Sequence, residues 1–140
     1  IYPVNAELLE AGIRRAKERG ASIIFSSHNM NNVEELCDNM VMLKNGRQVL
    51  NGTIQEIRES FGRTRLFLES PLTTEDLEAI PGVVSVREVN SGTHYVRLDN
   101  AQVGHQIFDL ATRDGYISTF SQQPPTIEEI FKQIAGEVDE

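Results

Sequence analysis

The stretch Ala21-Ser22-Ile23-Ile24-Phe25-Ser26-Ser27-His28 decides the expected fold. Its apolar run predicts a strand over Ser22–Ser26 that is hydrophobic on both faces, as a sheet covered on both sides requires. A helical pattern precedes this strand and ends at Gly20, and another helix is expected from Asn31. Helix, strand and helix in this order predict an α/β protein with a buried parallel sheet. Because the carboxyl ends of parallel strands face the ligand crevice, His28 is a candidate functional residue.

Local signals predict the other elements up to residue 62. The first helix is expected to begin at Asn5 as its N-cap, after Pro3-Val4. The elements after His28 are a helix with a capping box at Asn31-Asn32-Val33-Glu34, strands over Met40–Leu43 and Arg47–Leu50 joined at Asn45-Gly46, and a helix with a capping box at Thr53-Ile54-Gln55-Glu56 that Gly62 closes.

Charge divides the chain near Phe61-Gly62-Arg63-Thr64. The 140 residues carry a formal charge of −8, with eight acidic and seven basic residues up to Phe61 and thirteen acidic and six basic after it. A domain boundary is therefore expected there, giving domains 1–62 and 63–140. A net charge of this sign excludes nucleic-acid binding through a broad basic surface. The single Cys37 excludes a disulfide scaffold and is expected to pack as a small apolar residue.

The second part predicts a different architecture. Its elements follow the order β-α-β-β-α-β, the split βαβ pattern of an α+β ferredoxin-like domain. A C-terminal helix follows Pro124-Pro125, with a capping box at Thr126–Glu129. The expected strands are Leu66–Glu69, Val83–Val89, His94–Leu98 and Tyr116–Ser121, the expected helices are Thr73–Ile80 and Asn100 to Gly115, and the stripe of the last helix is Ile127, Ile130, Phe131 and Ile134.

An ordered series of motifs resembles the end of the nucleotide-binding domain of ABC transporters. The series spans about sixty residues, so it is more specific than any one motif in it. The second part is similar to the C-terminal extension of a bacterial subgroup whose ATPases drive export-type permeases. The matching segments are Pro3-Val4-Asn5, Ile23–His28, Val33–Asp38, Leu43-Lys44-Asn45-Gly46 and Asn51-Gly52-Thr53.

The resemblance assigns roles to particular residues. His28 aligns with the histidine of the H-loop, which in the family contacts the γ-phosphate of ATP. Tyr2, Pro3, Val4 and Asn5 align with the D-loop, where the family has an aspartate at the position of Tyr2. In the full-length protein the resemblance implies ATP and Mg²⁺, a transmembrane permease, a second ATPase subunit, and a cytoplasmic place at the inner face of the membrane.

Other family motifs do not occur in the 140 residues. The sequence contains no Gly-x-x-x-x-Gly-Lys-Ser/Thr and no Leu-Ser-Gly-Gly signature. It is therefore expected to be a C-terminal portion of an ATPase subunit, an α/β remnant of a P-loop ATPase domain followed by the ferredoxin-like domain. One histidine–phosphate contact supplies roughly 1.5–3 kcal/mol, whereas millimolar affinity needs about 4 kcal/mol. This chain alone is thus expected neither to bind nor to hydrolyse ATP.

Two expectations about association and metals accompany this assignment. If Ile23, Ile24 and Phe25 stay exposed to water, the chain loses the roughly 1.5–3 kcal/mol of free energy that burial of each side chain would contribute. Pairing into a homodimer is therefore expected. No spacing groups the histidines with Cys37, so no metal site is expected.

Two other functions stay open. The ferredoxin-like part is, in the first alternative, a regulatory or dimerisation module that senses a small ligand or a partner protein. In the second, the parent is an ATPase that acts without transport.

Overall fold

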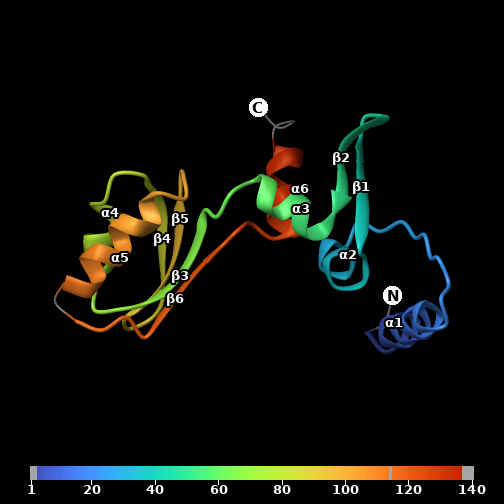
Figure 1. Ribbon diagram of the computed structural model, residues 1–140, viewed down its shortest axis with the longest axis horizontal. Coiled ribbons are helices and arrows are strands. Elements are labelled where there is room, and N and C mark those ends of the chain that lie inside the picture. The colour runs from blue at the N-terminus through green and yellow to red at the C-terminus, as the bar shows by residue number, and fades with distance from the viewer. Residues whose placement is uncertain (1–2, 114, 137–140) are drawn as a thin grey trace.

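The computed structural model describes residues 3–113 and 115–136 (Figure 1). These residues form two separate hydrophobic cores, and helix α1 belongs to neither. Side chains are described from residue 6 onward. The elements are α1 (Pro3–Glu18), α2 (Met30–Leu36), β1 (Asn39–Lys44), β2 (Arg47–Thr53), α3 (Ile54–Ser60), β3 (Arg65–Glu69), α4 (Thr74–Glu78), β4 (Val83–Asn90), β5 (Thr93–Leu98), α5 (Val103–Arg113), β6 (Thr119–Gln123) and α6 (Ile127–Gly136).

The first core packs helices against a β-hairpin. Strands β1 and β2 pair antiparallel around Asn45-Gly46, whose φ angles of 52° and 73° are those of the expected tight hairpin turn. Met40 and Met42 alternate into this core from β1, whereas Val41 faces solvent. Helices α2, α3 and α6 supply its other buried residues, which are Met30, Val33, Ile57, Ile127 and Ile130.

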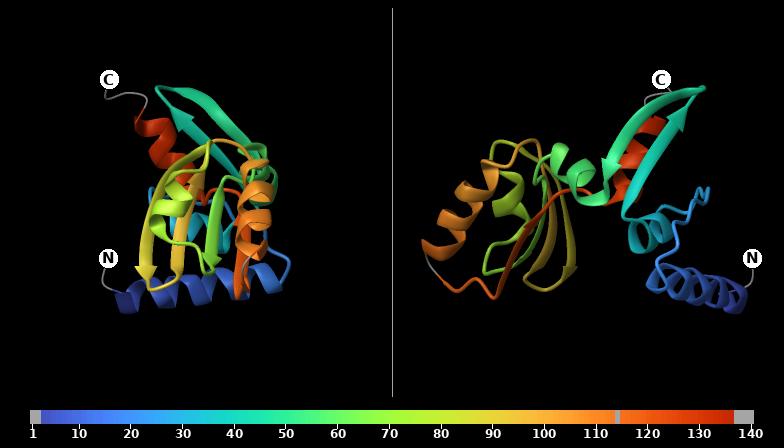
Figure 2. Two further views of the ribbon diagram at one scale, coloured as in Figure 1. Left: turned by 90° about the vertical axis from the view of Figure 1, so that its left-hand side faces the viewer. Right: turned by 45° about the vertical axis from the view of Figure 1, so that its right-hand side comes forward.

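The second core lies between a four-stranded sheet and two helices. Its strand order is β4-β5-β3-β6, and every neighbouring pair is antiparallel. Helices α4 and α5 cover the face of the sheet that looks away from α3 and α6 (Figures 1 and 2). The buried apolar residues of this core are Leu66, Leu68, Leu77, Val96, Leu98, Val103 and Ile107.

Helix α6 follows the four-stranded sheet in sequence but packs in the other core. Ile127 and Ile130 are fully buried against residues of α2, β1 and α3. Figure 2 shows the chain leaving β6 and returning to α3 before α6 begins. The predicted stripe is confirmed at these two positions, while Phe131 is exposed. Burying two isoleucines contributes about 3–6 kcal/mol, so α6 is a structural part of the first core.

The expected strand over Ser22–Ser26 is wrong. These residues form no strand, Ile24 is 98% exposed, and both described sheets are antiparallel. A strand needs backbone hydrogen bonds from a neighbour, and none of the described strands lies beside this segment. The parallel sheet predicted from this stretch is therefore not formed by the described residues.

Two of the predicted capping boxes are confirmed. They begin at Thr53 and Thr73, and Glu56 and Asp76 are the reciprocal acids. Gly20, at φ 85°, closes α1, with its amide donating to Lys17 and the next amide donating to Ala16.

Several predicted boundaries need correction. Helix α1 begins at Pro3, so Asn5 lies inside the helix rather than at its N-cap. Asn29, not Asn31, caps α2, because the Asn29 side chain accepts a hydrogen bond from the amide of Asn32. The last strand begins at Thr119 rather than Tyr116.

Helix α1 stands apart from both cores (Figure 2). Leu8 and Leu9 are 68% and 59% exposed. Two exposed ion pairs, Arg14–Glu35 and Lys17–Asp38, join it to α2 and to the residues after α2. Surface pairs of this kind contribute about 0–1 kcal/mol, which is too little to fix a helix firmly. No helix of the described residues is long and apolar enough to cross a membrane.

Candidate functional site

His28 lies in the polar connector Ser27-His28-Asn29, between residues 22–26 and the start of α2. Its side chain is exposed and lines neither of the two cavities described below. The next residue, Asn29, is held from both sides: its amide donates to Ser27 Oγ at 3.0 Å, and its side chain caps α2. His28 is therefore positioned by the start of α2, not by a sheet edge.

The expected D-loop residues are only partly visible. Tyr2 lies outside the described residues, and so do the side chains of Pro3, Val4 and Asn5, whose backbone forms the first turn of α1. The D-loop assignment therefore stays a prediction.

The described residues do not fit ATP with Mg²⁺. A bound triphosphate needs several convergent donors, whereas His28 lines neither of the two cavities described below. No group of three or more His, Cys, Asp or Glu residues within the described part of the chain is arranged to hold a metal ion.

The other histidines have structural positions. His94 is buried, with Nε2 2.9 Å from Thr74 Oγ1, and His105 is exposed on α5. The Nδ1 atom of His94 makes no hydrogen bond with a described residue. Both histidines lie far along the sequence from His28, on elements of the second core.

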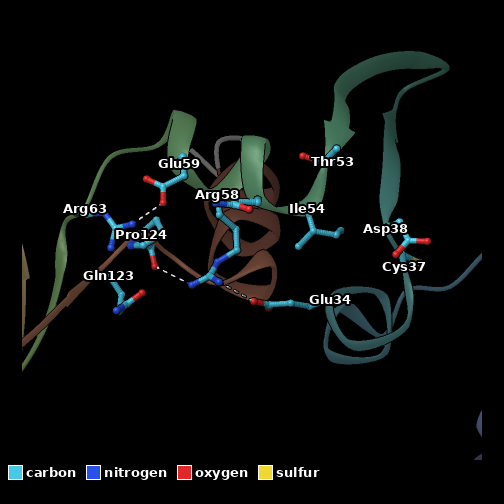
Figure 3. Close-up of a pocket in the computed structure, with 11 residues that line it drawn as sticks. Glu34, Cys37, Asp38, Thr53, Ile54, Arg58, Glu59, Arg63, Gln123 and Pro124 are labelled. Carbon is cyan, nitrogen blue, oxygen red and sulfur yellow. Dashed lines mark hydrogen bonds and ion pairs between the residues drawn. The ribbon is translucent and has the colours of Figure 1, made fainter.

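A cavity of about 750 Å³ opens where the two cores meet (Figure 3). Arg58 of α3 lies in its wall and points toward Glu34 of α2 and toward Pro124 (Figure 3). The Arg58 guanidinium donates to the carbonyl of Pro125 at 3.0 Å and to that of Pro124 at 3.3 Å, and it lies 3.4 Å from Glu34. We call these four residues, Glu34, Arg58, Pro124 and Pro125, the Arg58 cluster.

Glu34 makes a second contact within the same region. Its other carboxylate oxygen accepts a hydrogen bond from the backbone amide of Ile127 at 3.1 Å. That amide lies in the first turn of α6, where amides lack partners inside the helix and a negative charge is favourable. The Arg58 cluster therefore joins α2, α3 and the start of α6, and α2 is the helix that follows His28.

Further polar contacts fix both ends of α6. Arg65 of β3 pairs with Glu129, whose carboxylate also accepts from the amide of Thr126, and Lys44 donates to the carbonyl of Ile134 at 2.7 Å. Burial raises the pKa of Glu129, but the hydrogen bonds from Arg65 and Thr126 and the charge of Arg65 lower it more. The pKa of this carboxyl therefore lies below its ordinary value, as expected of a carboxylate held in its charged form.

Cys37 ends α2 at the rim of the same cavity. Burial and the neighbouring charge of Asp38 raise the pKa of its thiol, against a smaller opposing effect of Lys17. The thiol is thus less reactive than a free cysteine, which agrees with its partly buried place in the first core.

The Arg58 cluster was not predicted from the sequence. Glu34 was expected in a capping box, Arg58 was given no role, and the backbone groups that the two side chains contact lie more than sixty residues along the chain. Pro124-Pro125 was the available signal, because prolines leave carbonyls exposed to donors while offering no amide of their own.

Comparisons with known proteins cover almost the whole chain. Residues 52–135 match the family model described as ATP-binding protein DrrA1-3-like, C-terminal domain. An uncharacterized ABC transporter ATP-binding protein of Alkalihalophilus pseudofirmus is 34% identical over 134 residues, covering 96% of this chain and 50% of the relative.

Two relatives in Bacillus subtilis agree with this match. The uncharacterized ABC transporter ATP-binding protein YhaQ is 34% identical over 138 residues, covering 99% of this chain and 46% of the relative. The ABC-type transporter ATP-binding protein EcsA is 35% identical over 77 residues, covering 53% and 31%. The chain therefore spans about half the length of the first two relatives.

Proposed function

The chain belongs to the family of ABC transporter ATP-binding proteins, and from this membership we propose that it forms the C-terminal portion of an energy-coupling, ATP-hydrolysing transporter subunit. The observation that carries the proposal is the match over 99% of the chain to a relative about twice its length. ATP and Mg²⁺ are then used by the full-length protein, and the chain of 140 residues alone binds neither.

His28 is proposed as the H-loop histidine, which contacts the γ-phosphate of ATP in the full-length protein. Its exposure supports this role, because a residue that completes a site formed with other parts of a protein has to be accessible. Its place directly before the N-cap of α2 supports a link between that contact and α2. Tyr2 and Pro3–Asn5 are proposed as the D-loop region.

A division at residues 62 and 63 is proposed between the end of the nucleotide-binding domain and a ferredoxin-like accessory domain. The strand order β4-β5-β3-β6 supports the ferredoxin-like assignment. It places β5 between the strands of the β3-α4-β4 unit, and β3 between those of the β5-α5-β6 unit, which is a split βαβ arrangement. Helix α6 would then return from the accessory domain to the nucleotide-binding domain.

The accessory domain is proposed to regulate the ATPase or to mediate its dimerisation. The Arg58 cluster supports a regulatory link, because it connects the segment before α6 to α2 and so to the residues beside His28. A displacement of the four-stranded sheet would change the contacts of α2 through Arg58 and Glu34.

The proposed partners are a transmembrane permease and a second ATPase subunit, at the cytoplasmic inner face of the membrane. The 140-residue chain alone is proposed to form a homodimer, since Ile24, Leu8 and Leu9 are apolar and exposed. Light scattering across a concentration series tests this pairing, and a monomer at every concentration would contradict it.

The test of the proposed function compares two histidines in a full-length protein that contains this chain. We expect His28→Ala to lower ATP hydrolysis by at least about a hundredfold, because electrostatic stabilisation in the transition state is lost. His105→Ala is the matched control, since His105 is also exposed but lies on α5. Equal hydrolysis by both variants would refute the role of His28.

Ligand sensing by the accessory domain is retained as a second candidate function. The observation that favours it is a second cavity, of about 530 Å³, on the sheet face that α4 and α5 leave uncovered.

A further inference from the structure

The uncovered face of the four-stranded sheet carries two rows of side chains. Across the strands, Arg87 lies opposite Tyr95, and Tyr95 lies opposite Phe67. Two residues farther along β5, on the same face of the sheet, Arg97 lies opposite Arg65. These positions alternate with Leu66, Leu68 and Val96, which face α4 and α5, so they point to the other side. We call Phe67, Arg87, Tyr95 and Arg97 the arginine–aromatic face.

The first row offers a flat apolar surface. The ring centroids of Phe67 and Tyr95 are 4.9 Å apart, and the planes are tilted by 54°. The guanidinium of Arg87 lies 4.9 Å from the centroid of Tyr95, within the range of a cation–π contact. Tyr95 is 46% exposed, so this packing leaves ring surface open to a ligand.

The second row contains an unbalanced charge. Arg65 is neutralised by Glu129, but the described residues place no acidic side chain at ion-pairing distance from Arg97. An anion bound beside Arg97 gives this guanidinium a partner, and the planar guanidinium fork matches a carboxylate well.

The cavity has the size of a small-molecule site. Its volume of about 530 Å³ lies between the sheet and the segment that leads into α6, with Pro124 and Thr126 in the wall. Ligand pockets usually measure about 300–1,000 Å³ and combine apolar walls with few polar groups. The wall also contains Arg58 and Arg65, whose charges are paired with Glu34 and Glu129. The formal charge of −8 on the whole chain disfavours a polyanion such as a nucleotide or a single-stranded nucleic acid.

From these contacts we propose that the arginine–aromatic face binds an aromatic carboxylate, with its ring on Phe67 and Tyr95 and its carboxylate on Arg97. Arg97 offers its guanidinium fork to a carboxylate, whereas Arg87, which also has no acidic partner among the described residues, lies over the ring of Tyr95. The aromatic pair fits a planar ring. This proposal rests on ligand sensing by the accessory domain and is independent of ATP hydrolysis and of His28, so it stands or fails separately from the role of His28.

The test uses 2-naphthoate as the probe and the 140-residue chain, with calorimetry and the Nε–H resonance of Arg97 as readouts. We expect saturable binding with a Kd of about 1 mM or tighter and a shift of the Arg97 resonance. Arg97→Gln should weaken binding by roughly tenfold or more, because a charge-assisted hydrogen bond is lost. Arg113→Gln is the matched control, because Arg113 is an exposed arginine at the end of α5, and it should leave the affinity unchanged.

Two further comparisons separate the carboxylate and the ring. We expect 2-naphthylmethanol, which lacks the charge, and cyclohexanecarboxylate, which lacks the aromatic ring, each to bind roughly tenfold more weakly than 2-naphthoate. The proposal is overturned if 2-naphthoate does not saturate at about 10 mM, or if Arg97→Gln and Arg113→Gln bind it equally. Tighter binding of AMP or of a short oligonucleotide would also overturn it.

Discussion

Replacing Arg58 with alanine tests whether the Arg58 cluster holds α6 in the first core. The change removes two charge-assisted hydrogen bonds, to the carbonyls of Pro125 and Pro124, and one ion pair, with Glu34. Each such bond contributes about 1.5–3 kcal/mol, and both prolines are buried, so their carbonyls would lose a partner. Because the side chains of Arg58 and Glu34 are about one quarter exposed, solvent screening reduces the sum. We expect a loss of about 2–4 kcal/mol in the free energy of unfolding.

The assay for this loss needs to resolve the two cores. The chain contains no tryptophan, so urea unfolding is followed by circular dichroism together with amide hydrogen exchange. We expect faster exchange in α6 and the β1–β2 hairpin, with β3 and β5 unchanged. Arg47→Ala is the matched control, because Arg47 is exposed on β2, and its effect should stay within about 0.5 kcal/mol. If Arg58→Ala is as stable as this control, the cluster does not hold α6.

Two further substitutions and one measurement of thiol reactivity test other parts of the structure. Ile130→Ala should cost about 2–5 kcal/mol in urea unfolding, since Ile130 is fully buried, and a loss below about 1 kcal/mol would contradict the packing of α6. Glu129→Gln should destabilise the protein at neutral pH. The pKa of Glu129 is lowered in the folded state, so its contribution to stability is present above the pKa of the unfolded chain and is lost in acid. The difference in stability from wild type should therefore shrink as pH falls below about 4.3. A difference that persists at acid pH would refute this linkage. Cys37 should react with iodoacetamide more slowly than glutathione at pH 8, because burial raises the pKa of its thiol, and an equal rate would show that the thiol is accessible and unperturbed.

The predictions that held depend on a few neighbouring residues. The capping boxes at Thr53 and Thr73 each close within four residues, and the Asn45-Gly46 turn fixes its own φ angles. The motif series from Pro3 to Thr53 also carried the family assignment, which the comparisons confirm.

The predictions that failed depend on partners elsewhere. The apolar pattern of Ser22–Ser26 is typical of a buried strand, but a pattern cannot supply the neighbouring strand whose amides and carbonyls would make it one. The start of α2 was misplaced because Asn29 and Asn31 are chemically equivalent caps.

The sequence by itself determined the Asn45-Gly46 turn, the capping boxes at Thr53 and Thr73, the β-α-β-β-α-β order and the family. Only the tertiary structure decided that α6 packs with α2 and α3, that Arg58 and Glu34 meet the segment before it, and that Arg97 lies opposite Arg65. The physical reason is the range of each interaction. Caps and turns are made by atoms within four residues along the chain, whereas the Glu34–Ile127 contact joins residues 93 positions apart. The family series assigned His28 its proposed role, but its exposed place beside α2 came from the fold alone.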